Sequence, residues 1–196
     1  MAFIELISDS EASEEARKLF EEAERERGYV PNYLRLFAHR PAVYEAWRNL
    51  LRSVTANIDA RRYELATVGA ARKLRSTYCT LAHGTVLLDR FLEANELRDV
   101  VVDHHAAGLD EIEIAIMDLA EKVADDATAV IPADVERLRE LGLSDAEIFD
   151  VVLTAAVRCF FSKTLDALCV QADSVFNELA PALRQTLTVG RPIAAD

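Results

Sequence analysis

Glycine and proline are scarce in this sequence, with 6 glycines and 5 prolines among 196 residues. Both residues interrupt helices, so their scarcity favours continuous helices, and alanine, leucine, glutamate and arginine dominate the remainder. Strand-forming runs are also lacking. The segment Ile4-Glu5-Leu6-Ile7 can be extended but is too short to found a sheet. The composition predicts an all-α helical bundle.

Basic residues and long apolar runs are few. Lysine and arginine number 22 against 34 aspartates and glutamates, for a formal net charge of −12. An acidic surface repels phosphate backbones, which argues against nucleic acid as a partner. The longest nearly uncharged stretch, residues 148–157, is too short to span a bilayer, and the first residues do not resemble a signal peptide. We expect a soluble, cytoplasmic protein with no membrane partner.

Cysteine is rare too, and the three present do not have the paired spacing of a secreted disulfide scaffold. Apolar residues make up 51% of the chain, enough for a core without disulfides or a bound metal. Cys159 and Cys169 lie in apolar segments and are expected in that core. Cys79 lies in a different setting, described below.

Capping and stop signals divide the chain into helices. The expected order begins with a helix that stops at Gly28. Further helix starts are expected at these positions: Pro31, Pro41, Asp59, Ser76, Leu97, Asp110, Pro132, Ser144 and Ser162. The helix from Leu97 should run to Ala107, and a last long helix roughly from Ser162 to Glu178. We predict one domain over residues 1–196, with an N-terminal helical extension (1–58), a core (59–180) and a tail (181–196) that is loosely held or docked on a neighbour.

Two segments share a spacing that suggests an internal repeat. Glu64 is followed at offsets of 12, 15 and 19 by Ser76, Cys79 and His83. The same offsets from Glu147 reach these residues: Cys159, Ser162 and Asp166. We interpret this as a degenerate two-helix repeat whose first copy holds the reactive groups. The alternative is that any two amphipathic hairpins align this well.

The candidate catalytic residues are concentrated in residues 75–84. If Ser76 caps a helix, Cys79 is its third residue, where unpaired backbone N–H groups favour negative charge on sulfur. His83, four residues later, faces the same side and can exchange a proton with the thiol. Glu64, one helix earlier, can orient His83 or receive the proton. Ser76 and Tyr78 are expected to support this site.

This pattern resembles the AhpD-like (carboxymuconolactone decarboxylase) family. The family pattern is a glutamate, eleven residues, a cysteine, two residues, a second cysteine, three residues and a histidine, and Glu64, Cys79 and His83 match it. Residues 28–32, 38–41 and 138–148 are similar to its longer, peroxidase-related branch. The resemblance covers about residues 28–180. It implies a helical fold, a homo-oligomer (trimer or hexamer) and an antioxidant oxidoreductase.

One position departs from the family, because Ser76 stands where the first cysteine is expected. A serine cannot form the intramolecular disulfide of the paired cysteines. A Cys79 sulfenic acid would then pass to an external thiol, or to Cys159 or Cys169. The resemblance implies a thiol-dependent, alkylhydroperoxidase-like peroxidase that reduces small peroxides, with an external thiol as reductant and no bound cofactor.

Two other functions stay open. In a carboxymuconolactone decarboxylase-like lyase, His83 would be the acid or base and Cys79 a bystander. Its small carboxylic substrate would be held by cationic side chains, for which the candidates are Arg72, Arg75 and Arg158. Alternatively, the chain is a degenerate homologue kept for assembly or binding.

Simpler interpretations accompany each candidate residue. Cys79 can be a small buried apolar residue, His83 a satisfied core histidine, and Glu64 the partner of a nearby arginine. The run Asp103-His104-His105 suggests a metal site. Consecutive helical residues diverge by about 100°, however, so no metal site is expected there.

Overall fold

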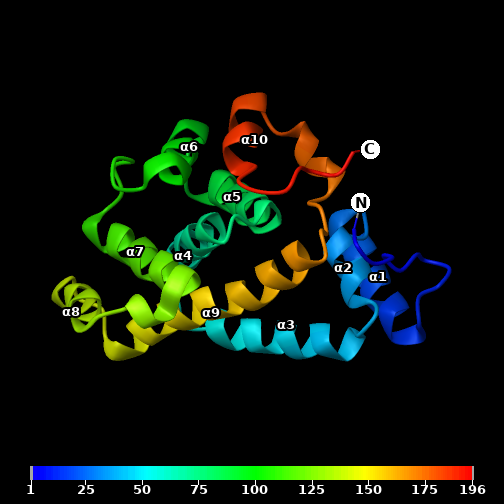
Figure 1. Ribbon diagram of the computed structural model, residues 1–196, viewed down its shortest axis with the longest axis horizontal. Coiled ribbons are helices and arrows are strands. Elements are labelled where there is room, and N and C mark those ends of the chain that lie inside the picture. The colour runs from blue at the N-terminus through cyan, green and yellow to red at the C-terminus, as the bar shows by residue number, and fades with distance from the viewer. Residues whose placement is uncertain (1, 196) are drawn as a thin grey trace.

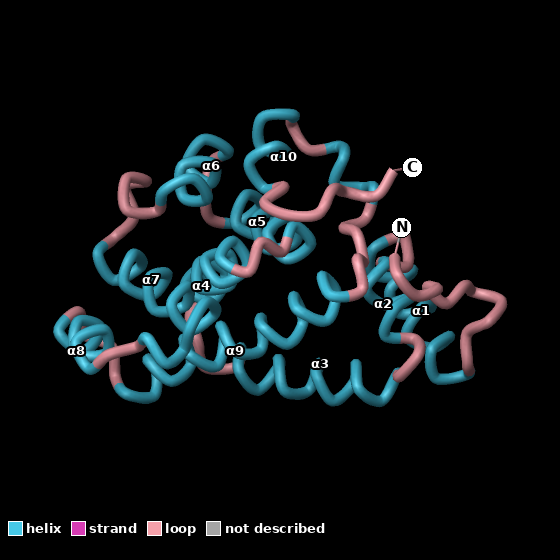
Figure 2. Tube along the Cα trace, viewed as in Figure 1, coloured by secondary structure: helices cyan, strands magenta, loops and turns pink. Residues whose placement is uncertain are grey.

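The computed structural model describes residues 2–195, and within that range the chain is helical with no strand, as predicted (Figure 2). Two of the elements, η1 and η2, are short 3-10 helices. The elements are α1 (Glu14–Arg27), α2 (Asn32–Phe37), α3 (Pro41–Thr55), α4 (Ala60–Lys73), α5 (Thr77–Arg90), α6 (Ala94–Asp103), α7 (Glu111–Asp126), η1 (Ala127–Ala129), α8 (Pro132–Glu140), α9 (Asp145–Ala167), η2 (Ser174–Glu178) and α10 (Pro181–Leu187).

Helix α4 is the centre of the fold, and every residue from Tyr63 to Ala71 on it is buried. Small residues allow this burial on all sides. A Cβ added to Gly69 would lie 3.4 Å from the Met117 carbonyl oxygen, so α7 packs directly on the α4 backbone. Leu65 and Val68 face one apolar cluster, with α5, α6 and α10. Ala66 faces a second, with α7, α8 and α9. A polar residue within this buried stretch of α4, such as Glu64, is therefore held inside the molecule.

Helix α9 is longer than predicted and crosses the molecule beside α3 (Figure 1). The expected helix from Ser162 to Glu178 is wrong. Helix α9 continues unbroken to Ala167, the chain turns at Cys169 with a φ of 56°, and a short 3-10 helix follows. The second copy of the proposed repeat is thus one continuous helix and not a hairpin. Ser162 does not begin a helix, because its hydroxyl donates to the Cys79 sulfur instead.

The N-terminal section covers one end of α9 with aromatic side chains. Trp47 of α3 stacks on Phe161 of α9 with ring centroids 4.5 Å apart, and Tyr33 and Phe37 contact the same ring. Such aromatic contacts each contribute about 0.5–1.5 kcal/mol beyond the area they bury. The section therefore packs against the helix that, as shown below, supplies two partners of Cys79.

The C-terminal tail packs on its own chain and is not loosely held. The Gly190 N–H donates to the Thr77 hydroxyl (2.8 Å), and the Ala194 N–H donates to the Ala172 carbonyl (2.9 Å). A Cβ at Gly190 would lie 1.9 Å from the Arg75 carbonyl oxygen, so only glycine allows this approach. The tail thus crosses the turn that leads into α5.

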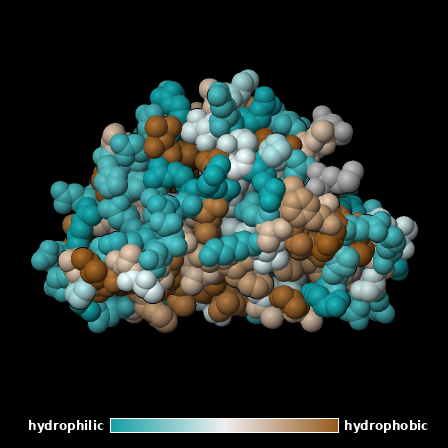
Figure 3. Space-filling model, in the orientation of Figure 1, coloured by the Kyte–Doolittle hydropathy of each residue, from teal (hydrophilic) through white to brown (hydrophobic). Residues whose placement is uncertain are grey.

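Exposed apolar side chains gather along the lower edge in Figure 3, where α3 and α9 run. They include Val43 and Leu50 of α3 and Phe149 and Phe160 of α9. No helix among residues 2–195 is long and apolar enough to cross a membrane. Exposed apolar side chains gathered in one region are typical of a surface that contacts another protein.

Candidate functional site

Cys79 occupies the predicted position at the start of α5. The helix begins at Thr77 with Ser76 as its N-cap, so Cys79 is the third helical residue. The preceding turn is tight: Arg75 has a φ of 56°, and the Ser76 N–H donates to the Ala71 carbonyl at 2.9 Å. This turn brings the first turn of α5 against α4 and α9.

The Ser76 side chain does not cap the helix as expected. It is fully buried and makes no capping hydrogen bond. It faces Asp166 of α9 instead. Burial raises the pKa of Asp166, and the Ser76 hydroxyl opposes that rise. The prediction of Ser76 as N-cap is therefore right in position and wrong in its chemistry, because the buried hydroxyl accepts from no backbone N–H of α5.

The Cys79 sulfur is buried among polar groups and not in hydrocarbon. Only 1% of the residue is exposed. The Ser162 hydroxyl donates to the sulfur (3.1 Å), and the Arg158 guanidinium donates to it through Nη1 (3.5 Å). Both donors come from α9. The buried sulfur thus has two polar donors, one of them cationic.

Arg158 is a buried cation with few partners. It is 2% exposed, its Nη2 donates to the Tyr63 hydroxyl (3.3 Å), and its Nε has no partner. No carboxylate forms a salt bridge with it within residues 2–195. Burial alone would lower the pKa of Arg158, but the Cys79 and Tyr63 groups raise it above its ordinary value. A charged guanidinium therefore faces the sulfur without a carboxylate to neutralise it.

His83 is joined to Glu64 and lies nearest to solvent. Its Nδ1 is 2.6 Å from a Glu64 carboxylate oxygen, and the two side chains are 18% and 11% exposed. Burial, and next the charge of Arg158, lower the pKa of His83 against the opposing effect of Glu64. The neutral ring then carries its proton on Nδ1, because a carboxylate only accepts, and Nε2 is left as a base.

The two reactive groups are not joined directly. No hydrogen bond links the Cys79 sulfur to the His83 ring in the described part of the chain. The predicted pairing of His83 with Glu64 is found. Arg158 contacts the sulfur and acts electrostatically on His83. A proton passing from Cys79 to His83 needs a bridging water or substrate.

The remaining candidates lie elsewhere or serve other contacts. The buried Tyr78 hydroxyl donates to the Asp173 carboxylate and so ties α5 to the segment after α9. Cys159 packs in the second apolar cluster. The Cys169 sulfur accepts from Arg191 at 3.2 Å. Arg72 binds Glu121 on α7, away from the sulfur.

The sequence does not identify Arg158 and Ser162 as partners of the Cys79 sulfur. It indicates Arg158 only as a substrate-binding cation, and Ser162 only as a helix start or repeat position. One signal was available: an arginine within the apolar run Val157–Phe161 must either reach the surface or be paired inside. The spacing itself did not say which residue of α5 it would meet.

Because the pKa of His83 is lowered in the folded protein, acidification should lower the free energy of unfolding. As the pH falls below its ordinary value of 6.5, the unfolded chain takes up a proton that the folded chain does not, so the free energy of unfolding decreases. The decrease ends below the folded pKa. We expect His83→Asn, which keeps an N–H donor for Glu64, to remove this part of the pH dependence.

Urea unfolding from about pH 8 to about pH 5 measures this effect. His39→Asn is the matched control, because His39 is exposed and contacts only the Glu5 carbonyl by its side chain. Parallel curves for the unsubstituted protein and the His83 variant would contradict the assignment of a neutral His83.

No protein-family model and no curated protein matches the chain. Solved structures do match. A peroxidase-related AhpD-core protein from Ralstonia eutropha JMP134 is 20% identical with a TM-score of 0.79, over 97% of this chain and 98% of that one. A peroxidase-related protein from Silicibacter sp. TM1040 is 21% identical with a TM-score of 0.78, over 87% and 91%.

A third match is the debrominase Bmp8 in complex with 2,3,4-tribromopyrrole. It is 16% identical with a TM-score of 0.74, over 95% of this chain and 98% of that one. Together these structures show that the chain has the AhpD-like helical fold that its sequence suggested. They also show that one fold accompanies more than one activity.

Proposed function

We propose that this protein is a thiol-dependent oxidoreductase of the peroxidase type, with Cys79 as its nucleophile. One observation carries the proposal: the Cys79 sulfur accepts hydrogen bonds from a buried, uncompensated guanidinium and from the Ser162 hydroxyl. A structural cysteine in a core needs neither donor, and a buried charge is costly unless something anionic faces it. The fold shared with peroxidase-related proteins supports the same function.

In the proposed reaction the Cys79 thiolate attacks the terminal oxygen of a hydroperoxide, the one that bears the hydrogen. The S–O bond forms as the O–O bond breaks, giving a sulfenic acid and an alkoxide. The alkoxide takes up one proton and leaves as an alcohol. Sulfur is oxidised by two electrons and the peroxide is reduced by two, so the step balances without a cofactor.

His83 and Glu64 manage the proton in this scheme. A neutral His83 takes the thiol proton on Nε2 through a bridging water and returns it to the leaving alkoxide. Glu64 holds the ring by accepting from Nδ1 at 2.6 Å and stabilises the imidazolium that forms between the two transfers. The substrate approaches past His83, which is more exposed than Glu64 or Cys79.

An external thiol completes the cycle. It attacks the sulfenic sulfur, releases water and leaves a mixed disulfide, which a second thiol reduces. Cys159 packs in a different apolar cluster and Cys169 is bound by Arg191, so neither is placed to resolve Cys79. We place this chemistry in the cytoplasm, where thiol reductants are abundant and the three cysteines would stay free.

The test is oxygen addition at Cys79. The protein is treated with one equivalent of hydroperoxide, sulfenic acid is trapped with dimedone, and peptide mass spectrometry locates the adduct. We expect the adduct on Cys79 and not on Cys159 or Cys169. Absence of oxidation at Cys79, while the residue still reacts with a small alkylating reagent, would refute the proposal.

The two alternatives predict other outcomes. A lyase that holds a carboxylate with three arginines is not favoured, because Arg72 is engaged with Glu121 and only Arg158 adjoins Cys79. The likeness to a debrominase makes a bromopyrrole a second substrate for the assay. A degenerate binding protein would react with neither substrate, and its thiol would be no more reactive than free cysteine.

We also propose that the protein is a homo-oligomer, a trimer or hexamer, through the apolar side chains exposed on α3 and α9. Leu50 lies in this region and is exposed. Light scattering on the unsubstituted protein should give a mass three or six times that of one chain. Leu50→Glu should shift it towards the monomer, because association would bury the added charge. A monomer at micromolar concentration would contradict the proposal.

A further inference from the structure

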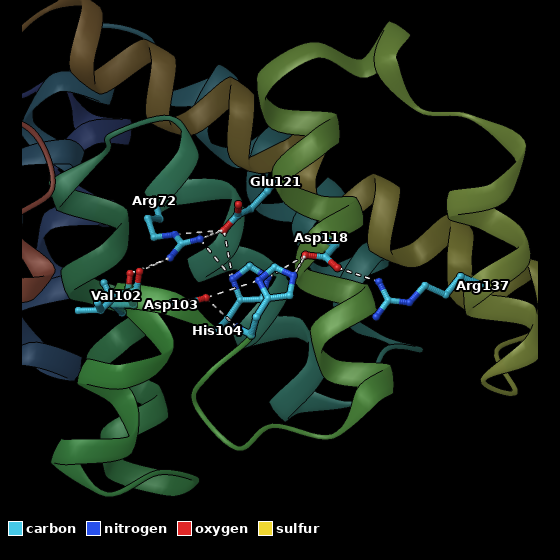
Figure 4. A network of polar contacts seen from close by, with 9 residues as sticks. Arg72, Val102, Asp103, His104, Asp118, Glu121 and Arg137 are labelled. Atoms are coloured by element: carbon cyan, nitrogen blue, oxygen red, sulfur yellow. Dashed lines mark hydrogen bonds and ion pairs between the residues drawn. The ribbon is translucent and has the colours of Figure 1, made fainter.

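A second polar cluster lies between the end of α6 and α7 (Figure 4). Helix α6 ends at Asp103, so His104 is its C-cap and His105 lies in the following turn. The two imidazole rings are tilted by 33° to each other with centroids 4.2 Å apart. They share a target, although His104 keeps helical backbone angles.

Both rings direct the same nitrogen at the same oxygen. His104 Nε2 and His105 Nε2 are each 2.9 Å from Oδ1 of Asp118. All three atoms lie within 4.8 Å of one another. Two imidazole nitrogens and one carboxylate oxygen are a common set of ligands for zinc and related divalent ions.

The outward nitrogens of both rings face carboxylates as well. His104 Nδ1 is 3.7 Å from Glu121, and His105 Nδ1 is 3.5 Å from Asp103. Metal-bound histidines usually donate their second N–H to such a carboxylate, which orients the ring and makes it a better ligand. Arg72 donates to His104 Nδ1 (3.2 Å), so without a metal that nitrogen accepts and Nε2 carries the ring proton. When Nε2 binds an ion, the proton moves to Nδ1 and Arg72 keeps Glu121 and two backbone carbonyls as acceptors.

Asp118 is available as an anionic ligand. Its Oδ1 faces the Nε2 atoms of both histidines at 2.9 Å. Arg137 binds the other oxygen, Oδ2, at 2.9 Å and leaves Oδ1 facing the two rings. The carboxylate is thus held in one orientation by a cation on its far side.

The distances are close to those a bound ion requires. Ligand bonds of about 2.0 Å in a tetrahedron separate the ligand atoms by about 3.3 Å, and the two N–O distances are 2.9 Å. Opening them by a few tenths of an ångström is easy for His105, whose side chain is 58% exposed. His104 is buried and fixed. A cavity of about 370 Å³, lined in part by Asp118, Glu121 and Arg137, adjoins the carboxylate side of the cluster.

We propose that His104, His105 and Asp118 bind a divalent transition-metal ion, most favourably zinc, with solvent completing the coordination. The site has three protein ligands and an exposed side, the arrangement of an open zinc site and not of a closed structural one. The ion would join the turn after α6 to α7. This proposal is independent of the thiol chemistry at Cys79.

Cobalt(II) substitution tests the site and separates it from binding at a thiol. Cobalt in a nitrogen and oxygen site gives visible d–d bands without sulfur-to-metal charge-transfer bands. The full chain is titrated with cobalt, and zinc affinity is then measured by competition. We expect one ion per chain, d–d bands without charge transfer, and zinc affinity at least about tenfold weaker in His105→Ala.

His105 is chosen because it is exposed, so its loss should leave the fold intact. His39→Ala is the matched control, and it should bind cobalt and zinc as the unsubstituted protein does. Circular dichroism and the melting temperature verify that both variants are folded. Three results would overturn the proposal: no d–d bands at millimolar cobalt, charge-transfer bands that point to cysteine, or unchanged zinc affinity in His105→Ala. Each would leave the cluster as a hydrogen-bonded network alone.

Discussion

Cys79→Ser should lower thiol-dependent peroxide turnover by more than about 1,000-fold, as expected when the nucleophile of a covalent mechanism is removed. Serine has nearly the size of cysteine and keeps acceptors for Arg158 and Ser162, the two donors to the sulfur. The fold should therefore be retained, with the free energy of unfolding changed by about 1 kcal/mol or less. Turnover is measured by peroxide consumption with a small dithiol as reductant.

Cys159→Ser and Cys169→Ser are the matched controls for this loss. Neither residue contacts the site, so both variants should turn over peroxide at close to the unsubstituted rate. A loss in either control comparable to that in Cys79→Ser would mean that a second cysteine resolves the sulfenic acid. Full turnover in Cys79→Ser would end the thiol mechanism.

Arg158→Met should slow the oxidation of Cys79 by peroxide without lowering the stability of the fold. Methionine fills similar space without the charge, so the Cys79 sulfur loses a donor at 3.5 Å and the only cation that contacts it. The thiolate is the reacting form of cysteine, so losing its cationic donor should lower the reactive fraction of Cys79 by about 100-fold. We expect a loss of that size in the rate of Cys79 oxidation by peroxide, measured by quenched-flow mass spectrometry.

The same substitution should leave the protein equally stable or more stable. A buried charge without a carboxylate partner is costly, and apolar replacement of buried ionic groups is neutral or stabilising by about 1–4 kcal/mol. Arg158→Lys is the control for charge: it retains a cation but cannot reach the sulfur and Tyr63 together, so it should recover part of the rate. Fast oxidation in Arg158→Met, or marked destabilisation, would show that the arginine is structural.

Helical periodicity, capping residues and proline positions predicted the fold class and most helix starts. The prediction failed where a residue with capping chemistry lies inside a helix. Ser162 looks like a helix start, yet α9 continues through it because its hydroxyl has a tertiary partner in Cys79. Local sequence does not contain that information, since the two residues are 83 positions apart.

The candidate site was also predictable only in part, because some of its contacts join residues far apart in the sequence. Spacing on neighbouring helices placed Cys79 at the start of α5 and joined His83 to Glu64. The position of Arg158 depends on how α9 crosses α5, which periodicity does not determine. For the histidine pair, helical geometry argued against a shared target, yet the side chains of His104 and His105 both reach Asp118.

The placement of Arg158 has a consequence for newly made protein. Arg158 follows Cys79 by 79 residues, so at about 5–20 residues per second the ribosome delivers it roughly 4–16 s later. During that interval the nascent chain carries Cys79 without the cation and hydroxyl that surround it in the finished fold. The thiol thus gains its distinctive environment only after α9 has been made, and a nascent chain truncated before α9 would lack both donors to the sulfur.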